Sequence, residues 1–184
     1  MNIKTAAVKP PQVLVAGYTL IILLGAFLLK QPYASAHGEP LRFIDALFTA
    51  TSAACVTGLM VADTGDFSVF GQIVLLILIQ TGGIGFMTMA TAFALLMKKR
   101  ITLKEKLILQ QSMNQHSLEG IIRLTRKVLF YALTIEAAAA VLFAIRWSFD
   151  MPVGQAVYYG VLHAVSLFNN AGFGWFGDEV SLSR

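Results

Sequence analysis

The sequence places AACVTGL at positions 53–59, directly after an apolar segment that is short for a membrane helix. A related stretch, FNNAGF, follows at 168–173, and aligning Gly58 with Gly172 sets an offset of 114 positions. Each stretch contains one glycine at a position where a packed helix has no need of one. A glycine can adopt positive φ and turn its carbonyl without interference from a Cβ. We interpret both stretches as ion-coordinating backbone loops inside a membrane.

The composition supports a membrane protein. Hydrophobic residues make up 57% of the 184 residues and charged residues only 13%, which is too little polar surface for a soluble globule. The single Cys55 excludes a disulfide within the chain, and the histidines have no cysteine partners at metal-ligand spacing. Eight of the 14 basic residues lie in the segment 98–127, and this concentration indicates membrane topology rather than nucleic-acid binding.

The apolar pattern predicts an all-α membrane protein with two similar units. We expect a first repeat over 1–98, with a crossing at 12–31, a short re-entrant helix at 43–54, a loop at 55–59 and a crossing at 67–98. A basic connection would occupy 99–126. A second, incomplete repeat would occupy 127–184, with a crossing at 127–147, a short helix at 154–168 and a loop at 169–173.

Charge counting favours re-entrant short helices over full crossings. If 46–62 dips into the membrane and returns, Lys4 and Lys9 share one side with the basic segment, as the positive-inside rule requires. The N-terminus is then cytoplasmic. Backbone that is not helical at membrane depth must be buried in protein or line a watery cavity, and rows of carbonyls that replace a cation's hydration shell are the best-known use of it.

Taken together, several motifs resemble the Trk/Ktr/HKT superfamily of potassium transporters, specifically the membrane subunit of a bacterial Ktr-type uptake system. They are PPQV at 10–13, FIDALFTA at 43–50, VTGL at 56–59, IQTGGIGF at 79–86 and FNNAGF at 168–173. The resemblance implies potassium-channel-like repeats and transport of K+ across the cell membrane, often stimulated by Na+. It also implies a homodimer in the lipid bilayer on a cytoplasmic nucleotide-binding regulatory subunit, with no enzymatic activity and no cofactor in this chain. Family members have four repeats, so the chain matches an N-terminal part only.

The candidate ion-binding residues contribute backbone carbonyls from the two loops. They are Cys55, Val56, Thr57, Gly58, Asn169, Asn170, Ala171 and Gly172. The alternative for both loops is an ordinary helix C-cap followed by an interfacial turn. The corresponding alternative function is a non-conducting fragment or membrane scaffold without a complete pore.

Three further features have competing interpretations. Glu136 lies near the middle of a crossing, where it is a functional candidate by default or pairs with an interior donor and fixes the fold. The cluster Gln80–Gly85 predicts a kink or a close helix contact rather than a dinucleotide loop, because it follows no strand. His163 is expected to be a packed, hydrogen-bonded residue rather than a sensor.

Overall fold

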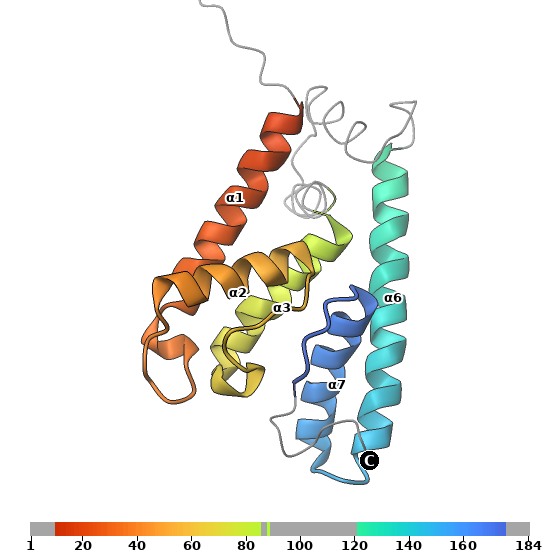
Figure 1. Ribbon diagram of the computed structural model, residues 1–184. Coiled ribbons are helices and arrows are strands. Elements are labelled where there is room, and N and C mark those ends of the chain that lie inside the picture. The colour runs from red at the N-terminus through yellow and green to blue at the C-terminus, as the bar shows by residue number, and fades with distance from the viewer. Residues whose placement is uncertain (1–9, 86–87, 89–120, 176–184) are drawn as a thin grey trace, which may run out of the picture.

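The computed structural model describes residues 10–85, 88 and 121–175. The helices, numbered as in Figure 1, are α1 (Pro10–Leu29), α2 (Phe43–Cys55), α3 (Val69–Ile84), α6 (Ile121–Trp147) and α7 (Val153–Phe168). Short 3-10 turns lie at Pro32–Ala34 and Thr64–Asp66. Within these ranges the only β pairing is an isolated bridge between Ser35 and Phe67. The expected all-helical fold is therefore confirmed, whereas the predicted inner end of the 67–98 crossing and most of the basic connection 99–126 lie outside the described residues.

Helix lengths fall into two classes. Two stretches, Gln12–Leu29 in α1 and Arg123–Trp147 in α6, are long and apolar enough to cross a membrane. The apolar helices α2 and α7 have 13 and 16 residues. At 1.5 Å per residue they reach about 20 and 24 Å, less than the roughly 30 Å of a bilayer core. These two short helices occupy the ranges in which re-entrant helices were predicted.

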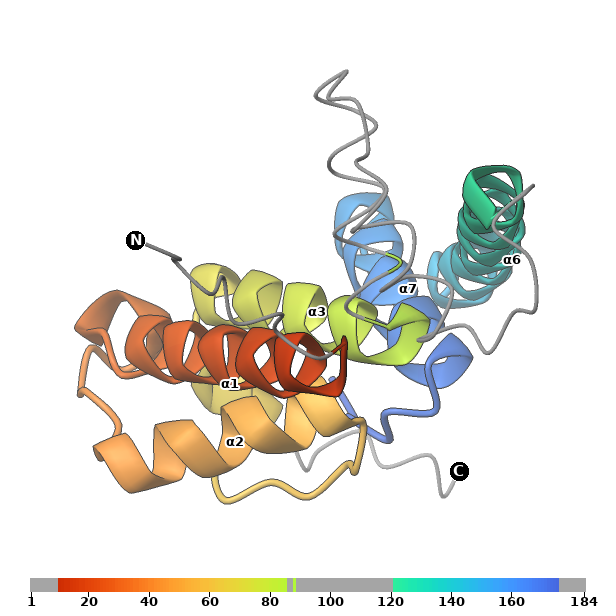
Figure 2. The ribbon, with the colours of Figure 1, turned by 90° about the horizontal axis from the view of Figure 1, so that it is seen from above.

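The helices form two groups joined by α3. Helices α1, α2 and α3 contact one another, α6 packs along α7, and α3 contacts α7 as well. Figures 1 and 2 show α3 lying between α1 and α2 on one side and α7 on the other. Each group contains a long helix and a short one that is followed by a loop.

Small residues let α1 and α3 approach closely. A Cβ built at Gly25 would lie 2.8 Å from Cδ1 of Leu78, and the neighbouring Ala26 and Leu29 are fully buried. Contact of this kind, rather than a hydrophobic driving force, holds helices together in lipid. Packing against α1 thus fixes the position of α3, and α3 in turn contacts the two loops.

The connections at the start of α3 are tied together by backbone hydrogen bonds. The amide of Ala36 donates to the carbonyl of Asp66 at 2.7 Å, and the amide of Ser68 donates to the carbonyl of Ala34 at 2.9 Å. Ser68 is also the N-cap of α3, since its hydroxyl accepts from the amide of Gly71 at 3.3 Å. A Ser N-cap satisfies one of the free amides at a helix start, and here it fixes where α3 begins.

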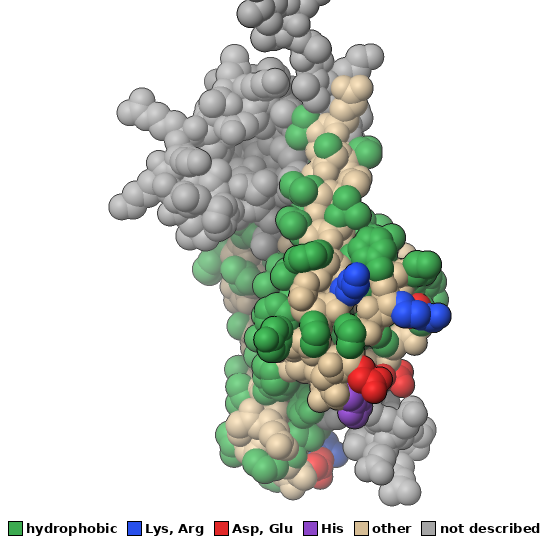
Figure 3. All heavy atoms as spheres, turned by 90° about the vertical axis from the view of Figure 1, so that its left-hand side faces the viewer, with side chains coloured by type: hydrophobic (Ala, Val, Ile, Leu, Met, Phe, Trp, Pro, Cys, Tyr) green, Lys and Arg blue, Asp and Glu red, His purple; other side chains and the backbone are tan. Residues whose placement is uncertain are grey.

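The outer surface of the helices is apolar. Large hydrophobic side chains are exposed along α1 and α6, including Leu24, Phe27, Phe130 and Leu142. Figure 3 shows hydrophobic side chains spread along the described part of one face, with the charged ones in its lower half. An apolar surface of this kind suits contact with lipid or with further transmembrane segments.

Candidate functional site

The first loop, residues 55–59, begins with a left-handed residue. Cys55 is the last residue of α2, and Val56 follows it with φ 56° and ψ 44°. The amide of Thr57 then donates to the carbonyl of Ser52 at 3.0 Å, and Gly58 has φ 73°. A β-branched residue at positive φ is a rare conformation that persists only where the surroundings impose it. The first loop is thus a defined structure rather than a frayed helix end.

The second loop, residues 169–173, repeats this pattern at the same offset of 114. Asn170 has φ 56° and Gly172 has φ 70°, matching Val56 and Gly58. The amide of Ala171 donates to the carbonyl of Ser166 at 2.7 Å, as Thr57 does to Ser52. In each loop the middle residue, Thr57 or Ala171, does not have positive φ, whereas the residues on both sides of it do. Neither loop is therefore an extended strand, in which successive carbonyls alternate in direction.

A buried serine supports each loop from behind. The hydroxyl of Ser52 accepts from the hydroxyl of Thr57 at 3.0 Å. The hydroxyl of Ser166 donates to the carbonyl of Phe173 at 2.9 Å and accepts from its amide at 3.0 Å. Ser52 and Ser166 are equivalent at the 114-residue offset, and both are buried. The side of each loop that faces its own helix therefore has its polar groups satisfied.

The two loops meet at their glycines. A Cβ built at Gly58 would lie 2.7 Å from the carbonyl oxygen of Ala171 and 3.5 Å from the Cα of Gly172. A Cβ built at Gly172 would lie 3.6 Å from the Cα of Gly58. The approach leaves no room for a side chain at Gly58, whereas at Gly172 the positive φ is what favours glycine. The structure thus brings together the two sets of residues that were singled out from the sequence.

One turn of α3 contacts the starts of both loops. A Cβ at Gly82 would overlap the carbonyl oxygen of Ala54, and a Cβ at Gly83 would overlap Oδ1 of Asn169. Helix α3 then ends at Ile84, and Gly85 follows with φ 91°. The expectation of a close contact for this cluster is therefore confirmed, and its partners are the ends of the two short helices.

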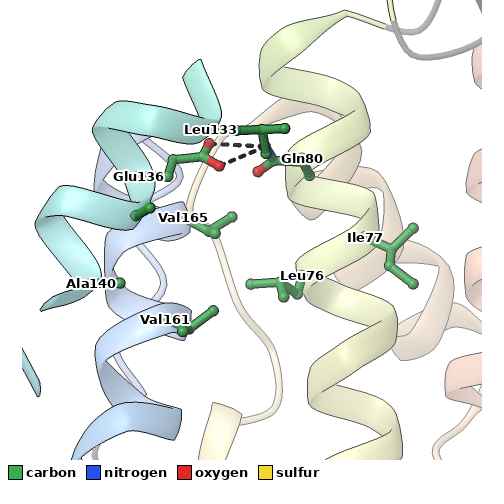
Figure 4. A pocket seen from close by; sticks show the side chains of 9 residues that line it. Leu76, Ile77, Gln80, Leu133, Glu136, Ala140, Val161 and Val165 are labelled. Carbon is green, nitrogen blue, oxygen red and sulfur yellow. Dashed lines mark hydrogen bonds between the residues drawn. The ribbon is translucent and has the colours of Figure 1, made fainter. Parts of the chain in front are cut away.

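Glu136 pairs with amide side chains. Nε2 of Gln80 donates to both carboxylate oxygens of Glu136 at 2.9 Å, as Figure 4 shows. Nδ2 of Asn169 donates to Oε1 of Gln80 at 3.0 Å, to Oε1 of Glu136 at 3.4 Å and to the carbonyl of Val165 at 2.9 Å. Within the part of the chain that the structure describes, no basic side chain pairs with Glu136. The pairing with interior donors is thus present, and Gln80 is a member that sequence reasoning had not assigned to it.

A cavity of about 420 Å³ lies beside this polar cluster, between α3, α6 and α7. Gln80 and Glu136 are its polar lining residues, and Figure 4 shows aliphatic side chains around the rest. The apolar lining residues are Leu76, Ile77, Leu133, Ala137, Ala140, Val161 and Val165.

A second polar chain ties the N-terminal end of α3 to Gly174, directly after the second loop. The hydroxyl of Thr64 donates to the carbonyl of Gly174, and Nε2 of Gln72 donates to the carbonyl of Thr64 at 3.1 Å. The hydroxyl of Tyr158 donates to Oε1 of Gln72 at 2.6 Å. Three segments far apart in sequence are joined here by side chains that are mostly buried.

Replacing Tyr158 by phenylalanine is expected to lower the free energy of unfolding by about 1 kcal/mol, because it leaves Oε1 of Gln72 without its 2.6 Å donor. Thermal unfolding of the detergent-purified protein measures the change. Tyr131→Phe is the matched control, since Tyr131 is an exposed tyrosine on α6. Equal unfolding temperatures for the two variants would contradict the role assigned to this chain.

His163 is packed, as expected. Its ring lies edge-on to Trp147 with centroids 4.8 Å apart, and its Nδ1 lies 3.1 Å from the carbonyl of Tyr159. Groups of three or more metal-ligating side chains do not occur among the described residues.

Comparison with known proteins places the chain in a transporter family. The family model described as "TrkH: Cation transport protein" matches residues 3–180. The chain is 43% identical, over 97% of its length, to the Ktr system potassium uptake protein B of Bacillus subtilis (strain 168), and covers 40% of that protein. It is 37% identical, over 94% of its length, to the potassium/sodium uptake protein NtpJ of Enterococcus hirae, and covers 38% of it.

A Ktr system potassium uptake protein B of Vibrio alginolyticus is 36% identical over 92% of the chain, which covers 37% of that relative. The chain thus spans about two fifths of the length of these relatives. The match to the family model nevertheless extends over nearly the whole chain. The chain belongs to the TrkH family of cation transport proteins.

Proposed function

We propose that the two loops coordinate potassium ions through their backbone carbonyls and form part of a transport path across the cell membrane. The coordinating residues are Cys55, Val56, Thr57 and Gly58 in the first loop and Asn169, Asn170, Ala171 and Gly172 in the second. The observation that carries the proposal is the repeated backbone: the same residues of two loops, 114 positions apart, adopt positive φ, and their glycines face each other. Carbonyl groups fixed at such a meeting point are the ligands that replace a cation's water shell.

Burial behind the loops and openness in front of them support this role. Ser52 and Ser166 are buried, whereas Thr57, Asn170 and Gly172 are exposed. Irregular backbone is tolerated at membrane depth where it lines a water-filled cavity, and a path for ions is such a cavity. The hydrogen bonds from Thr57 to Ser52 and from Ala171 to Ser166 also end α2 and α7 as helix C-caps, but a C-cap gives no reason for the two glycines to face each other.

The choice of ion follows from the relatives. Two of the relatives described above are named potassium uptake proteins, and one is named a potassium/sodium uptake protein. We therefore assign K+ as the transported ion and Na+ as the second ion to test. Alkali cations prefer oxygen ligands, and both loops offer carbonyl oxygens rather than the carboxylate cages typical of divalent ions.

We further assign the topology and partners on the same basis. The N-terminus and the basic segment lie in the cytoplasm, and α2 and α7 are re-entrant pore helices in repeats 1–98 and 127–184. The relatives named as parts of a Ktr system fit a transporter with additional subunits. We assign a homodimer and a nucleotide-binding regulatory subunit on the cytoplasmic side.

Expression of the protein from its complete coding sequence is expected to restore growth at low potassium in cells that lack their own uptake systems. Uptake of K+ and Na+ into these cells measures the ion preference directly, and K+ should be taken up faster at equal concentration. A non-conducting protein would reach the membrane without restoring uptake of either ion, and that result would overturn the proposal.

A further inference from the structure

We propose that Gln80, Glu136 and Asn169 act as a clamp that sets the position of the second loop, and through it the ion preference. This inference rests on the proposed function, because it assigns the three residues as positioning residues for a loop that coordinates ions. None of the three side chains needs to touch the ion. Their effect is transmitted through Asn169, the residue directly before the left-handed Asn170.

The side chain of Asn169 is fixed from three helices. Nδ2 donates to the carbonyl of Val165 on its own helix α7, to Gln80 on α3 and to Glu136 on α6. Its Oδ1 faces Gly83, where a Cβ would leave no room for it. The hydrogen bonds of the NH2 group and the packing of Oδ1 against Gly83 together fix the orientation of this amide. The backbone that follows it is therefore anchored at its first residue.

The carboxylate of Glu136 determines which way the amides point. A carboxylate is only an acceptor, so the NH2 group of Gln80 must turn toward it. That orientation leaves Oε1 of Gln80 facing away, where it accepts from Asn169 at 3.0 Å. Glu136 thus orients Gln80, and Gln80 together with Glu136 orients Asn169. Buried polar groups joined in this way act as a unit rather than as separate pairs.

Among the described residues, the first loop has no hydrogen-bonded side-chain cluster of this kind at its start. Cys55 occupies the position that corresponds to Asn169, and its side chain is exposed. The start of the first loop is supported instead by the contact of the Ala54 carbonyl with Gly82. The hydrogen bonds of the clamp therefore act directly on the second loop. Since Gln80, Gly82 and Gly83 belong to one turn of α3, this turn holds both loops in register.

Exchanging the two partners tests the clamp. Gln80→Glu places two carboxylates face to face without a cation, and we expect it to lower the preference for K+ over Na+ about tenfold while the amount of protein in the membrane stays within about twofold. In the double variant Gln80→Glu with Glu136→Gln, the amide donates to the carboxylate from the opposite side and Asn169 keeps an acceptor. The double variant should recover the parental preference to within about twofold.

Controls separate this role from folding and from surface charge. Gln155→Glu makes the same chemical change on an exposed residue of α7 and should leave ion preference unchanged. A double variant no better than Gln80→Glu alone would overturn the clamp. The clamp would also be overturned if Gln80→Glu lost uptake only because less protein reached the membrane, while the preference for K+ over Na+ and the KM for uptake stayed unchanged.

Melting temperatures distinguish failure of the clamp from failure of the proposed function. If Gln80 and Glu136 act as a unit, the double variant melts closer to the parent protein than Gln80→Glu does, whether or not the protein carries ions. If the parent transports neither ion, the proposed function and the effect on preference are both overturned. If Gly58→Ser changes preference and the Gln80 and Glu136 variants do not, only the clamp is wrong.

Discussion

Replacing Gly58 by serine is expected to lower the preference for K+ over Na+ by tenfold or more, with uptake itself reduced. Gly58 has φ 73°, a conformation that costs a residue with a side chain on the order of 1 kcal/mol or more. The new Cβ would also lie 2.7 Å from the carbonyl oxygen of Ala171. That oxygen belongs to the backbone of the second loop. Relieving the contact must therefore move either the backbone at Gly58 or the carbonyl of Ala171, and both are proposed ion ligands.

Gly38→Ser is the matched control for this prediction. Gly38 has the same φ of 73°, and a Cβ there would meet nothing within 4 Å. It carries the backbone strain without the contact between loops. Uptake of K+ and Na+ by the complete protein, corrected for the amount in the membrane, measures both variants. Unchanged relative uptake in Gly58→Ser, or an equal change in Gly38→Ser, would count against ion coordination at this loop.

The helices and loop positions were predictable from local sequence. An uncharged run marks α1, and an apolar run with Glu136 as its one charge, 128–145, marks α6. The apolar runs before Gly58 and Gly172 are too short for a full crossing, and they mark α2 and α7. The glycines mark the loops because only they adopt positive φ without strain. Both signals depend on residues close together in the chain, which is why the sequence contains them.

The conformation of Val56 was not predictable in the same way. A valine at left-handed φ contradicts its local preference, and the capping hydrogen bonds to the end of α2 and the packing of the loop on Gly82 impose it. The corresponding residue in the second loop is Asn170, for which this conformation is common. Aligning the two loops on their glycines was the available signal, since Asn170 falls opposite Val56.

The polar cluster was predictable only in part. Glu136 attracts attention because a carboxylate inside a membrane segment is costly. Its partners Gln80 and Asn169 lie 56 and 33 positions away, and no periodicity connects them. The same limit applies to Gly82 and Gly83: their small size predicted a close contact, but its partners, Ala54 and Asn169, depend on how the two groups of helices meet.

Replacing Gly82 by alanine is expected to destabilise the protein by about 1–3 kcal/mol, the usual cost of overpacking. The sign of the change in the free energy of unfolding is informative, because replacing glycine by alanine inside a helix otherwise stabilises a protein by about 0.5–1 kcal/mol. At Gly82 the new methyl group would overlap the carbonyl oxygen of Ala54. That oxygen is backbone at the end of α2, so it cannot move aside as a flexible side chain can, and α3 must shift from α2.

Gly154→Ala is the control with the opposite expected sign. Gly154 lies in the first turn of α7, and a Cβ there would meet nothing within 4 Å. Thermal unfolding in detergent should therefore show Gly154→Ala at or above the parental melting temperature and Gly82→Ala several degrees below it. A stabilised Gly82→Ala would contradict the close contact. A Gly82→Ala variant that is destabilised and also loses its preference for K+ would indicate that this turn of α3 sets the position of the first loop. The clamp is proposed to do the same for the second loop.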